Sequence, residues 1–399
     1  MNIRQLREDE RDESIDLSLF AFQATLTDEE REQRKQQMRP EETWVAEENG
    51  ALMSKLTLLS FDLFLAGTRI PAGGISGVAT WPEHRRGGIV RSLLEHSLKT
   101  MRENGQHLAL LYPFSVPFYR KFGWEMYADK QTITLKKDQL PERSRFSGRV
   151  RRIDQDAEVL GPIYDEWARR YNGIVARDHQ WWNRHVFRRK TGTVAVYRNQ
   201  DGEARGYMIY STAERTMTIK EWIWLDADAR RGLSTFVSNH DSMIDQAVIE
   251  TNPDGVLPFI LPDPGVKREI RSYFMSRIVD LKKFFESVPV NTDALKKPLI
   301  LHVDDPVCTW NRGIFILKNQ RGSLAIEHFE DKPKENTACQ HPPKRGVRVE
   351  IGSLTAVCLG KLSAQTLFEE EVLKSEDPDA VKVLDQLIDN REPFMYDFF

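Results

Sequence analysis

The feature that most constrains the fold is a segment in which an apolar strand runs into two arginines and two glycines, which then open an amphipathic helix. The segment reads Val78-Ala79-Thr80-Trp81-Pro82-Glu83-His84-Arg85-Arg86-Gly87-Gly88-Ile89-Val90-Arg91. Glycines at a strand-to-helix turn let the backbone approach a ligand closely, because no Cβ stands in the way. The free N–H groups and positive dipole end of the helix favour an anion, most often a phosphate, and arginine adds forked donors suited to phosphate oxygens. The segment therefore predicts a site for a phosphorylated cofactor.

The length and composition predict a globular chain of more than one domain. With 399 residues the chain exceeds one ordinary core, so two or three domains are expected. Apolar residues make up 40% and charged residues 29%, which argues against wholesale disorder. A net charge of −3 gives no overall basic character to attract nucleic acid, so no nucleic-acid partner is expected.

The pattern of apolar, charged and cysteine residues indicates a cytoplasmic setting. The charged stretch from Met1 to Glu13 does not read as a signal peptide. No apolar run approaches the roughly 18–20 residues of a membrane span, so no membrane association is expected. Cys308, Cys339 and Cys358 are odd in number and widely spaced, which predicts neither a disulfide framework nor a metal site.

The first part of the chain, residues 1–145, predicts a mixed α/β unit. Charged residues from Glu29 to Met38 predict a helix, and strands expected at Trp44–Glu47 and Ala51–Leu58 flank Asn49-Gly50, a strong hairpin signal. Val90, Leu94, Ser97 and Met101 mark the buried face of a helix that Gly105 is expected to end. Further elements complete the unit: strands at Phe61–Leu65, Arg69–Thr80 and His107–Tyr112, and a short helix at Pro117–Phe122.

The next part, residues 146–286, predicts a second copy of this unit. A hairpin is expected around Asp201-Gly202, and Arg230-Arg231-Gly232 lies 145 positions after Arg85-Arg86-Gly87. The second copy has Leu233 where the first has Gly88, and a branched side chain there would obstruct close approach to a phosphate. We therefore expect a duplicated unit in which only the first copy binds cofactor. The alternative is chance similarity between short α/β segments.

The last part, residues 287–399, predicts a third domain that begins after a proline-bearing boundary. Expected elements are strands at Gly313–Leu317 and Val347–Glu350, helices at Leu354–Leu359 and Ala380–Ile388, and a polar loop at Lys332–Arg345. Four of the last six residues are aromatic, whereas a chain terminus normally frays in water. The tail is therefore expected to be buried.

These motifs together resemble the GCN5-related N-acetyltransferases (GNAT). The loop here is Arg85-x-x-Gly88-x-Val90, where the general family has a small residue in place of Val90, and Phe118-Tyr119-Arg120-Lys121-Phe122-Gly123-Trp124 resembles the family's segment after the next strand. The whole layout is similar to the enhanced intracellular survival (Eis) branch. The resemblance implies two tandem GNAT units and an α+β domain like sterol carrier protein 2. In that branch the loop begins His-Arg-Arg and tolerates an apolar residue at position 90.

The resemblance implies roles for individual residues. Backbone groups of Arg86 to Arg91 would hold the pyrophosphate of acetyl-coenzyme A, Val78 to Thr80 would pair with its pantetheine arm, and Phe114 and Ser115 would flank its thiol. Tyr119 stands where the family places a general acid, and the terminal carboxylate of Phe399 where it places a general base. The alternatives are a solvated helix start at Arg85, a packing role for Tyr119 beside Phe118 and Phe122, and a tail docked only for stability.

The leading hypothesis is an N-acetyltransferase that moves acetyl from acetyl-coenzyme A to a primary amine, such as an aminoglycoside or lysine. Direct attack in a ternary complex is expected, because no cysteine occupies the cofactor segment to form an acyl-enzyme. The resemblance further implies a homohexamer. Two other functions stay open: a lipid or ligand carrier that uses the third domain, and a scaffold that senses acetyl-coenzyme A without turnover.

Overall fold

The computed structural model describes residues 1–330 and 345–399. The loop expected at 332–345 and Cys339 lie outside the described residues, apart from Arg345. Cys308 and Cys358 are free thiols, and both are buried. Across the described residues, no helix is long and apolar enough to cross a membrane.

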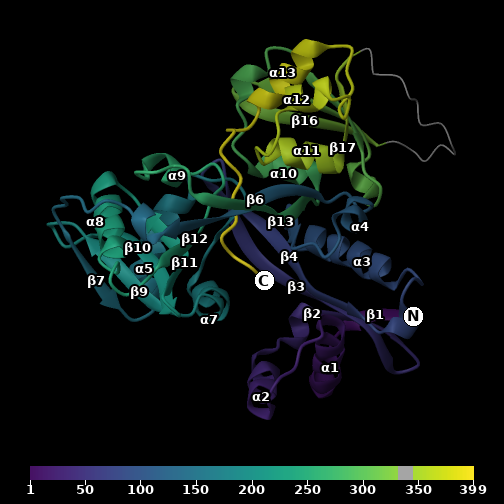
Figure 1. Cartoon of the computed structure of the whole chain (residues 1–399). Helices are drawn as coiled ribbons and strands as arrows, with labels where there is room; N and C mark the ends of the chain where they lie inside the picture. The colour runs from purple at the N-terminus through teal and green to yellow at the C-terminus, as the bar shows by residue number, and fades with distance from the viewer. Residues whose placement is uncertain (331–344) are drawn as a thin grey trace.

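One large mixed sheet runs through the first two units (Figure 1), in the order β1-β2-β3-β4-β5-β13-β6-β12-β11-β10-β9-β7, with β8 paired to β3 at one side. Its strands are β1 (Asn2–Gln5), β2 (Thr43–Glu48), β3 (Ala51–Leu65), β4 (Thr68–Thr80), β5 (Leu108–Leu111), β6 (Glu125–Lys136), β7 (Arg149–Ile153), β8 (Ile174–Ala176), β9 (Thr193–Arg198), β10 (Ala204–Ala213), β11 (Thr216–Trp224), β12 (Gln246–Thr251) and β13 (Lys267–Ile278).

Short helices cover this sheet on both sides of the junction between the units. They are α1 (Arg11–Phe22), α2 (Asp28–Gln37), α3 (Ile89–Glu103), α4 (Val116–Arg120), α5 (Ala157–Ala168), α6 (His179–Trp181), α7 (Phe187–Arg189), α8 (Ala227–Ser238) and α9 (Leu257–Ile260), with a π-helical turn at Trp182–Val186. The longest, α3, buries Leu93, Leu94, Ser97, Leu98 and Met101 along one stripe, as its sequence period requires.

The two units exchange their last long strands. β6, which belongs to the first unit by sequence, pairs antiparallel with β12 of the second unit, from Gln131 to Lys136. β13 of the second unit pairs with β5 of the first, so that Met275 lies opposite Leu111. β6 and β13 also pair with each other. The exchange fixes the two units relative to each other through backbone hydrogen bonds.

The third domain is a separate four-stranded sheet in the order β16-β15-β14-β17, packed with helices. Its elements are β14 (Leu299–Asp304), β15 (Gly313–Gln320), β16 (Ser323–Glu330), β17 (Val347–Glu350), α10 (Leu281–Ser287), α11 (Ile351–Cys358), α12 (Ala364–Glu369) and α13 (Pro378–Gln386). Buried Asn311 joins it to the large sheet: its Oδ1 accepts from Leu281 N at 2.9 Å, and its Nδ2 donates to Val279 O at 3.0 Å.

The predicted mixed α/β class and the hairpin at Asn49-Gly50 are confirmed, with Glu48 opposite Ala51. The two strands expected at 51–58 and 61–65 are one continuous strand, β3, because it pairs along its length with β2 or β4. Gly105 has φ +71° just after α3, as the sequence indicated.

The C-terminal tail leaves the third domain and lies against the first two units at the centre of the molecule, ending beside β3 (Figure 1). Asn172 is the first anchor. Its backbone N–H donates to Glu392 O at 3.0 Å, its carbonyl accepts from Phe394 N at 3.1 Å, and its side-chain oxygen accepts from Ala66 N at 2.8 Å. One buried asparagine therefore joins the tail to the β3–β4 hairpin, and the predicted burial of the tail is confirmed for Phe394, Tyr396 and Phe399.

A buried ion network is the second anchor of the tail. Both guanidinium Nη atoms of Arg177 donate to the carboxylate of Glu221 at 2.8 Å, and Nε donates to Asp397 Oδ2 at 3.0 Å. Lys190 pairs with the same Glu221 carboxylate. Burial opposes ionisation of Glu221, but Arg177 and Lys190 together hold the pKa of its carboxyl well below the ordinary value. Two cations and two carboxylates balance, so the network carries no net charge.

We predict that Glu221→Gln destabilises the fold strongly, by on the order of 3–5 kcal/mol, because Arg177 and Lys190 would then share Asp397 alone. Urea unfolding measures the change. The control is Asp245→Asn, which removes the exposed pair with Arg215 and should change the midpoint little. Equal effects of the two variants would contradict the prediction.

Candidate active site

The Arg-Arg-Gly-Gly segment forms an open turn between β4 and α3. Arg86 has φ +66° and Gly88 φ +81°, and a Cβ added at Gly88 would meet no atom within 4 Å. The space above the turn is therefore free. The Arg85 guanidinium holds the turn to its own strand, since Nε donates to Thr80 O at 3.1 Å.

Six consecutive backbone N–H groups, from Arg86 to Arg91, have no hydrogen-bond partner among the described residues, and the first helical bond in this turn comes from Ser92 N to Gly88 O. Each N–H is a strong donor that needs a partner. Unpartnered donors at the start of a fifteen-residue helix, with Arg85, Arg86 and Arg91 exposed around them, suit a diphosphate. The cofactor-binding role of this turn stays a prediction from the sequence.

β4 and β5 part just before this turn. They pair in parallel only from Ala72 to Ile75 on β4, whereas β4 continues to Thr80. Along Val78, Ala79 and Thr80, β4 remains paired with β3 on one side only, through Ala79 and Thr80. The open edge faces the space that β5 has left, and an extended group could pair there as an added strand.

Tyr119 lies on α4 in the same buried cluster as Ile89 and Val90 from the start of α3. Its ring is 2% exposed and contacts Phe114 at 5.2 Å and Trp124 at 6.3 Å between ring centroids. Burial raises the pKa of the Tyr119 phenol well above its ordinary value. Phe114 is exposed and Ser115 half-buried at the N-terminus of α4. Tyr119 thus contacts Phe114 and shares its buried cluster with the first residues of α3, which follow the Arg-Arg-Gly-Gly turn.

Phe399 lies on the opposite face of the sheet. Its ring contacts Phe61, Trp181 and Phe274, and a Cβ on Gly74 would collide with it at 2.7 Å. A Cβ on the neighbouring Gly73 would instead meet Met101 of α3, because successive side chains point to opposite faces of a strand. Phe399 therefore lies on the face of β4 that is turned away from α3, where it lines a cavity with Ser76 and Gly77, whereas Tyr119 belongs to the buried cluster on the α3 face.

A cavity of about 580 Å³ opens on the Phe399 side. Ser76 and Gly77 of β4 line it beside Lys55 of β3. The Lys55 ammonium is buried and donates to Ser14 O at 2.6 Å and Ser14 Oγ at 2.7 Å. Burial, with a smaller contribution from the charge of Arg34, lowers the pKa of Lys55 to about 7.

Sequence reasoning missed the cationic wall of this cavity. Arg34 comes from α2, while Arg184, Arg188 and Arg189 come from the segment that follows Trp181 and Trp182 in the second unit. The spacing of Arg184 and Arg188, four residues apart, was a signal of a shared helical face. Nothing local indicated that this face meets α2, which is more than a hundred residues earlier.

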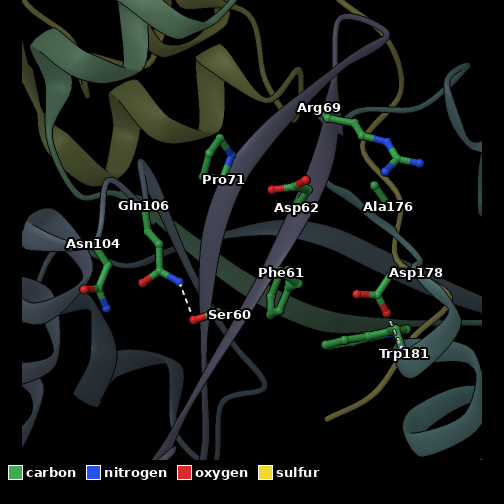
Figure 2. Close-up of a pocket in the computed structure, with 10 residues that line it drawn as sticks. All are labelled: Ser60, Phe61, Asp62, Arg69, Pro71, Asn104, Gln106, Ala176, Asp178 and Trp181. Carbon is green, nitrogen blue, oxygen red and sulfur yellow. Dashed lines mark hydrogen bonds between the residues drawn. The ribbon is translucent and has the colours of Figure 1, made fainter.

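A second cavity, of about 560 Å³, lies on the other side of Phe61 and Trp181 (Figure 2). Figure 2 shows Gln106 donating to Ser60, at 2.9 Å, and Asp178 accepting from Trp181 N, at 2.6 Å. This second cavity contains none of the predicted cofactor or catalytic residues. Its wall is the aromatic pair that supports Phe399, with ring centroids 4.9 Å apart. In the described residues, no three His, Cys, Asp or Glu side chains gather as a possible metal site.

The second Arg-Arg-Gly does not form a turn. α8 begins at Ala227, so Arg230, Arg231 and Gly232 lie inside the helix. Asp226 caps this helix by accepting from Ala229 N at 2.8 Å, and a Cβ on Gly232 would strike Tyr197 at 2.6 Å. We expected Leu233 to prevent phosphate binding in the second unit. The structure gives a different reason: the second unit has no open turn at Arg230-Arg231-Gly232, and Asp226 already caps the helix start.

Family models match three parts of the chain: acetyltransferase (GNAT) domains at residues 2–127 and 173–278, and a sterol carrier protein domain at residues 281–396. An uncharacterized N-acetyltransferase of Streptomyces avermitilis is 26% identical over 89% of this chain and 87% of its own length. One from Streptomyces griseus is 27% identical over 60% of this chain, and the match spans 64% of that relative. N-acetyltransferase Eis of Mycobacterium tuberculosis is 24% identical over 50% of this chain and 52% of its own length.

Solved structures share the whole arrangement. A probable N-acyltransferase from Enterococcus faecalis is 26% identical, with a TM-score of 0.88 over 100% of this chain and 99% of its own. Eis1 from Mycobacterium abscessus has a TM-score of 0.79 at 21% identity over 100% of both chains, which shows a shared fold. The predicted order of two tandem acetyltransferase units and a sterol-carrier-like domain is confirmed.

We predict that Lys55→Met stabilises the protein more at pH 6 than at pH 9. The folded-state pKa of about 7 lies below the unfolded value of about 10.4. The unfolded state therefore binds more protons between these values, and wild-type stability rises with pH through this window. The gain from Lys55→Met should shrink by on the order of 2 kcal/mol between pH 6 and pH 9, measured by urea unfolding. The exposed Lys99→Met control should show no such pH dependence; an equal gain from Lys55→Met at both pH values would refute the assignment.

Proposed function

Because the chain belongs to the Eis-like branch of the GCN5-related N-acetyltransferases, a family that uses acyl-coenzyme A, we propose that it transfers acetyl from acetyl-coenzyme A to a primary amine. The observation that carries the proposal is the run of six unpartnered backbone N–H groups at the start of α3, beside the buried Tyr119. The start of α8, the corresponding helix of the second unit, does not offer the same donors, since Asp226 caps it.

The first step is binding. Backbone N–H groups of Arg86, Gly87, Gly88, Ile89, Val90 and Arg91 would hold the pyrophosphate, and the free edge of Val78, Ala79 and Thr80 would pair with the pantetheine amides. The co-substrate supplies an acetyl thioester. Phe114 and Ser115, at the start of α4, would flank the thiol end and exclude water from it.

The proposed general acid is Tyr119. Its raised pKa keeps the phenol protonated at neutral pH, so the proton is available to a leaving thiolate. The same apolar surroundings would also raise the pKa of the coenzyme A thiol. Because the pKa values of phenol and thiol rise together, the free energy of proton transfer between them stays close to its value in water.

The proposed general base is the carboxylate of Phe399. It would take the proton of the attacking ammonium, directly or through water, so that the neutral amine attacks the thioester carbon. The Phe399 ring is held by Phe61, Trp181 and Phe274, and its neighbour Asp397 by Arg177, which supports an ordered carboxylate at this position.

Three finer features remain proposals. We propose domains at residues 1–145, 146–286 and 287–399, although the exchange of β6 and β13 means that sequence units and spatial units differ. A cytoplasmic location and a homohexamer are proposed by analogy with the family, and light scattering tests the second.

A carrier function for the third domain has less support. The tail does not fill this domain, because its aromatic rings pack on the other two units. One cavity in the third domain, of about 580 Å³, has a mixed wall in which six charged side chains stand among apolar residues such as Leu299 and Val383: Asp293, Lys296, Lys297, Asp377, Asp379 and Lys382. A lipid chain needs an apolar lining.

We predict that Gly88→Ala weakens coenzyme A binding at least about tenfold in titration calorimetry, because the added methyl group would stand over the phosphate turn. Gly50→Ala is a matched control. Gly50 has φ +84°, and a Cβ there also meets no atom within 4 Å, so both variants carry the same backbone strain of roughly 1–2 kcal/mol. Equal loss of affinity in both would show that strain, not the site, is responsible.

We also predict that Tyr119→Phe lowers kcat about 10²-fold with coenzyme A affinity unchanged. Tyr210→Phe, at another buried tyrosine, is the control and should keep full activity.

Deleting Phe399 should reduce kcat further than Tyr119→Phe does. Appending one glycine after Phe399 should have the same effect, because it keeps the Phe399 ring but moves the carboxylate. Thiol release measures each rate. Full activity in the glycine-extended chain would exclude the terminal carboxylate as the base.

A further inference from the structure

The cavity beside Phe399 has an unusual balance of charge. Its wall carries the cations Arg34, Arg39, Lys55, Arg184, Arg188 and Arg189. The acidic side chains in the same wall are Glu30 and Glu42. Counting the Phe399 carboxylate as a third anion still leaves the cations in clear excess. An acceptor that enters this cavity therefore meets a positive field.

The two carboxylates offset that field only in part, because they face six cations. Glu30 is engaged at the start of α2, where its carboxylate accepts from Thr27 N at 2.8 Å and from Thr27 Oγ1 at 3.1 Å. Burial raises the pKa of Glu42, which weakens its hold on a negative charge. Neither forms an ion pair with an arginine of the wall within the described residues.

Four of the arginines lack a charge partner. Arg34, Arg184, Arg188 and Arg189 form no ion pair and donate no side-chain hydrogen bond anywhere in residues 1–330 or 345–399; Arg189 only stacks on Phe398, with 4.8 Å from its guanidinium carbon to the ring centroid. Their side chains come from α2 and from the segment 184–189, so two units contribute to one wall. Arg177 and Arg205, in contrast, are each paired with carboxylates.

Two other ionisable groups in the cavity do not change this balance. Burial lowers the pKa of His185, stacked 4.1 Å from Trp181, to about 4, so it is neutral at neutral pH. Lys55 is already bonded to Ser14. Excess positive charge disfavours a second ammonium on the acceptor, because like charges brought together in a partly enclosed site repel. Planar guanidinium forks, in contrast, match the oxygens of a carboxylate or phosphate.

We propose that the acceptor of this enzyme is an amine that also carries an oxyanion, a carboxylate or phosphate, held by Arg34, Arg184, Arg188 and Arg189 while its amino group points to the opening between β4 and β5. The inference rests on the acetyl transfer proposed above and adds the class of acceptor. It separates this chain from enzymes whose acceptors are polycations such as aminoglycosides. The positive wall also favours the neutral form of the bound amine, which is the nucleophile.

Four amines of similar length test the proposal: butylamine, 1,4-diaminobutane, 4-aminobutyrate and 4-aminobutyl phosphate. With the full chain and acetyl-coenzyme A, we expect kcat/KM for at least one acidic amine to exceed that for the diamine by more than about tenfold, chiefly through KM. The preference should fall as salt is raised. The two acidic arms distinguish carboxylate from phosphate. A preference for the diamine or for butylamine would overturn the proposal.

The double variant Arg184→Gln/Arg188→Gln should reduce the ratio of acidic-amine to butylamine activity at least about tenfold. The matched control is Arg151→Gln/Arg152→Gln, on exposed arginines of β7 at the far edge of the sheet, which should leave the ratio unchanged. An unchanged ratio in the first variant, or an equal loss of its coenzyme A affinity, would contradict the assignment of these arginines to the acceptor.

A failure of the proposed acetyl transfer gives a different result from a failure of the oxyanion site. If coenzyme A binds but none of the four amines causes thiol release from acetyl-coenzyme A, the proposed acetyl transfer to such amines is wrong. The cavity is then tested by calorimetry with coenzyme A present, using N-acetyl-4-aminobutyrate against the uncharged N-butylacetamide. Tighter binding of the acidic compound, lost in Arg184→Gln/Arg188→Gln, would support oxyanion recognition without turnover. Equal binding of the two compounds would overturn the oxyanion site itself.

Discussion

The site depends on the buried network of Arg177, Glu221, Lys190 and Asp397. Removing these charges from water costs several kcal/mol per ion, and only the paired geometry offsets that cost. Such a network tolerates few alternative positions, so it fixes Asp397 within the second unit. Phe398 and Phe399 are the next two residues, and their position follows directly. A chain end that would fray in water is thereby held against Phe274 and beside Ser76 and Gly77 of β4.

Strand exchange gives this network a fixed frame. β6 and β13 pair with strands of the other unit, so the two units cannot separate without breaking backbone ladders. The cavity beside Phe399 takes Arg34 from the first unit and Arg184 to Arg189 from the second. If the units moved as independent domains, that wall would open and close with every displacement. One continuous sheet instead holds the cationic wall at a constant distance from the Arg-Arg-Gly-Gly turn.

Part of the fold and of the candidate site could be predicted, because it depends on residues that are close in sequence. The turn at Gly88, the hairpin at Asn49-Gly50 and the buried face of α3 depend on residues close in sequence, and each was predicted. The missing turn in the second unit had a local signal as well, since Asp226 with Asp228 in the next turn indicates a helix start before Arg230. The strand exchange, Lys55 and the arginine wall had no such signal, because each depends on a partner distant in sequence. Burial, which lowers the pKa of Lys55, is decided only when β3 pairs with β4 beneath α1.

The unpaired arginines and the buried lysine point to one requirement. Placing Arg34, Arg184, Arg188 and Arg189 around one cavity costs free energy in the empty protein, since each repels the others and lacks a carboxylate. A purely structural role would be better served by pairing them, as Arg177 is paired. A bound oxyanion would relieve that repulsion, and the free energy released on relief would add to the affinity for an acidic acceptor. The same field opposes an ammonium near Lys55 and so favours the uncharged amine that must attack. On the proposed function, recognition of the acceptor and activation of its nitrogen have one electrostatic origin.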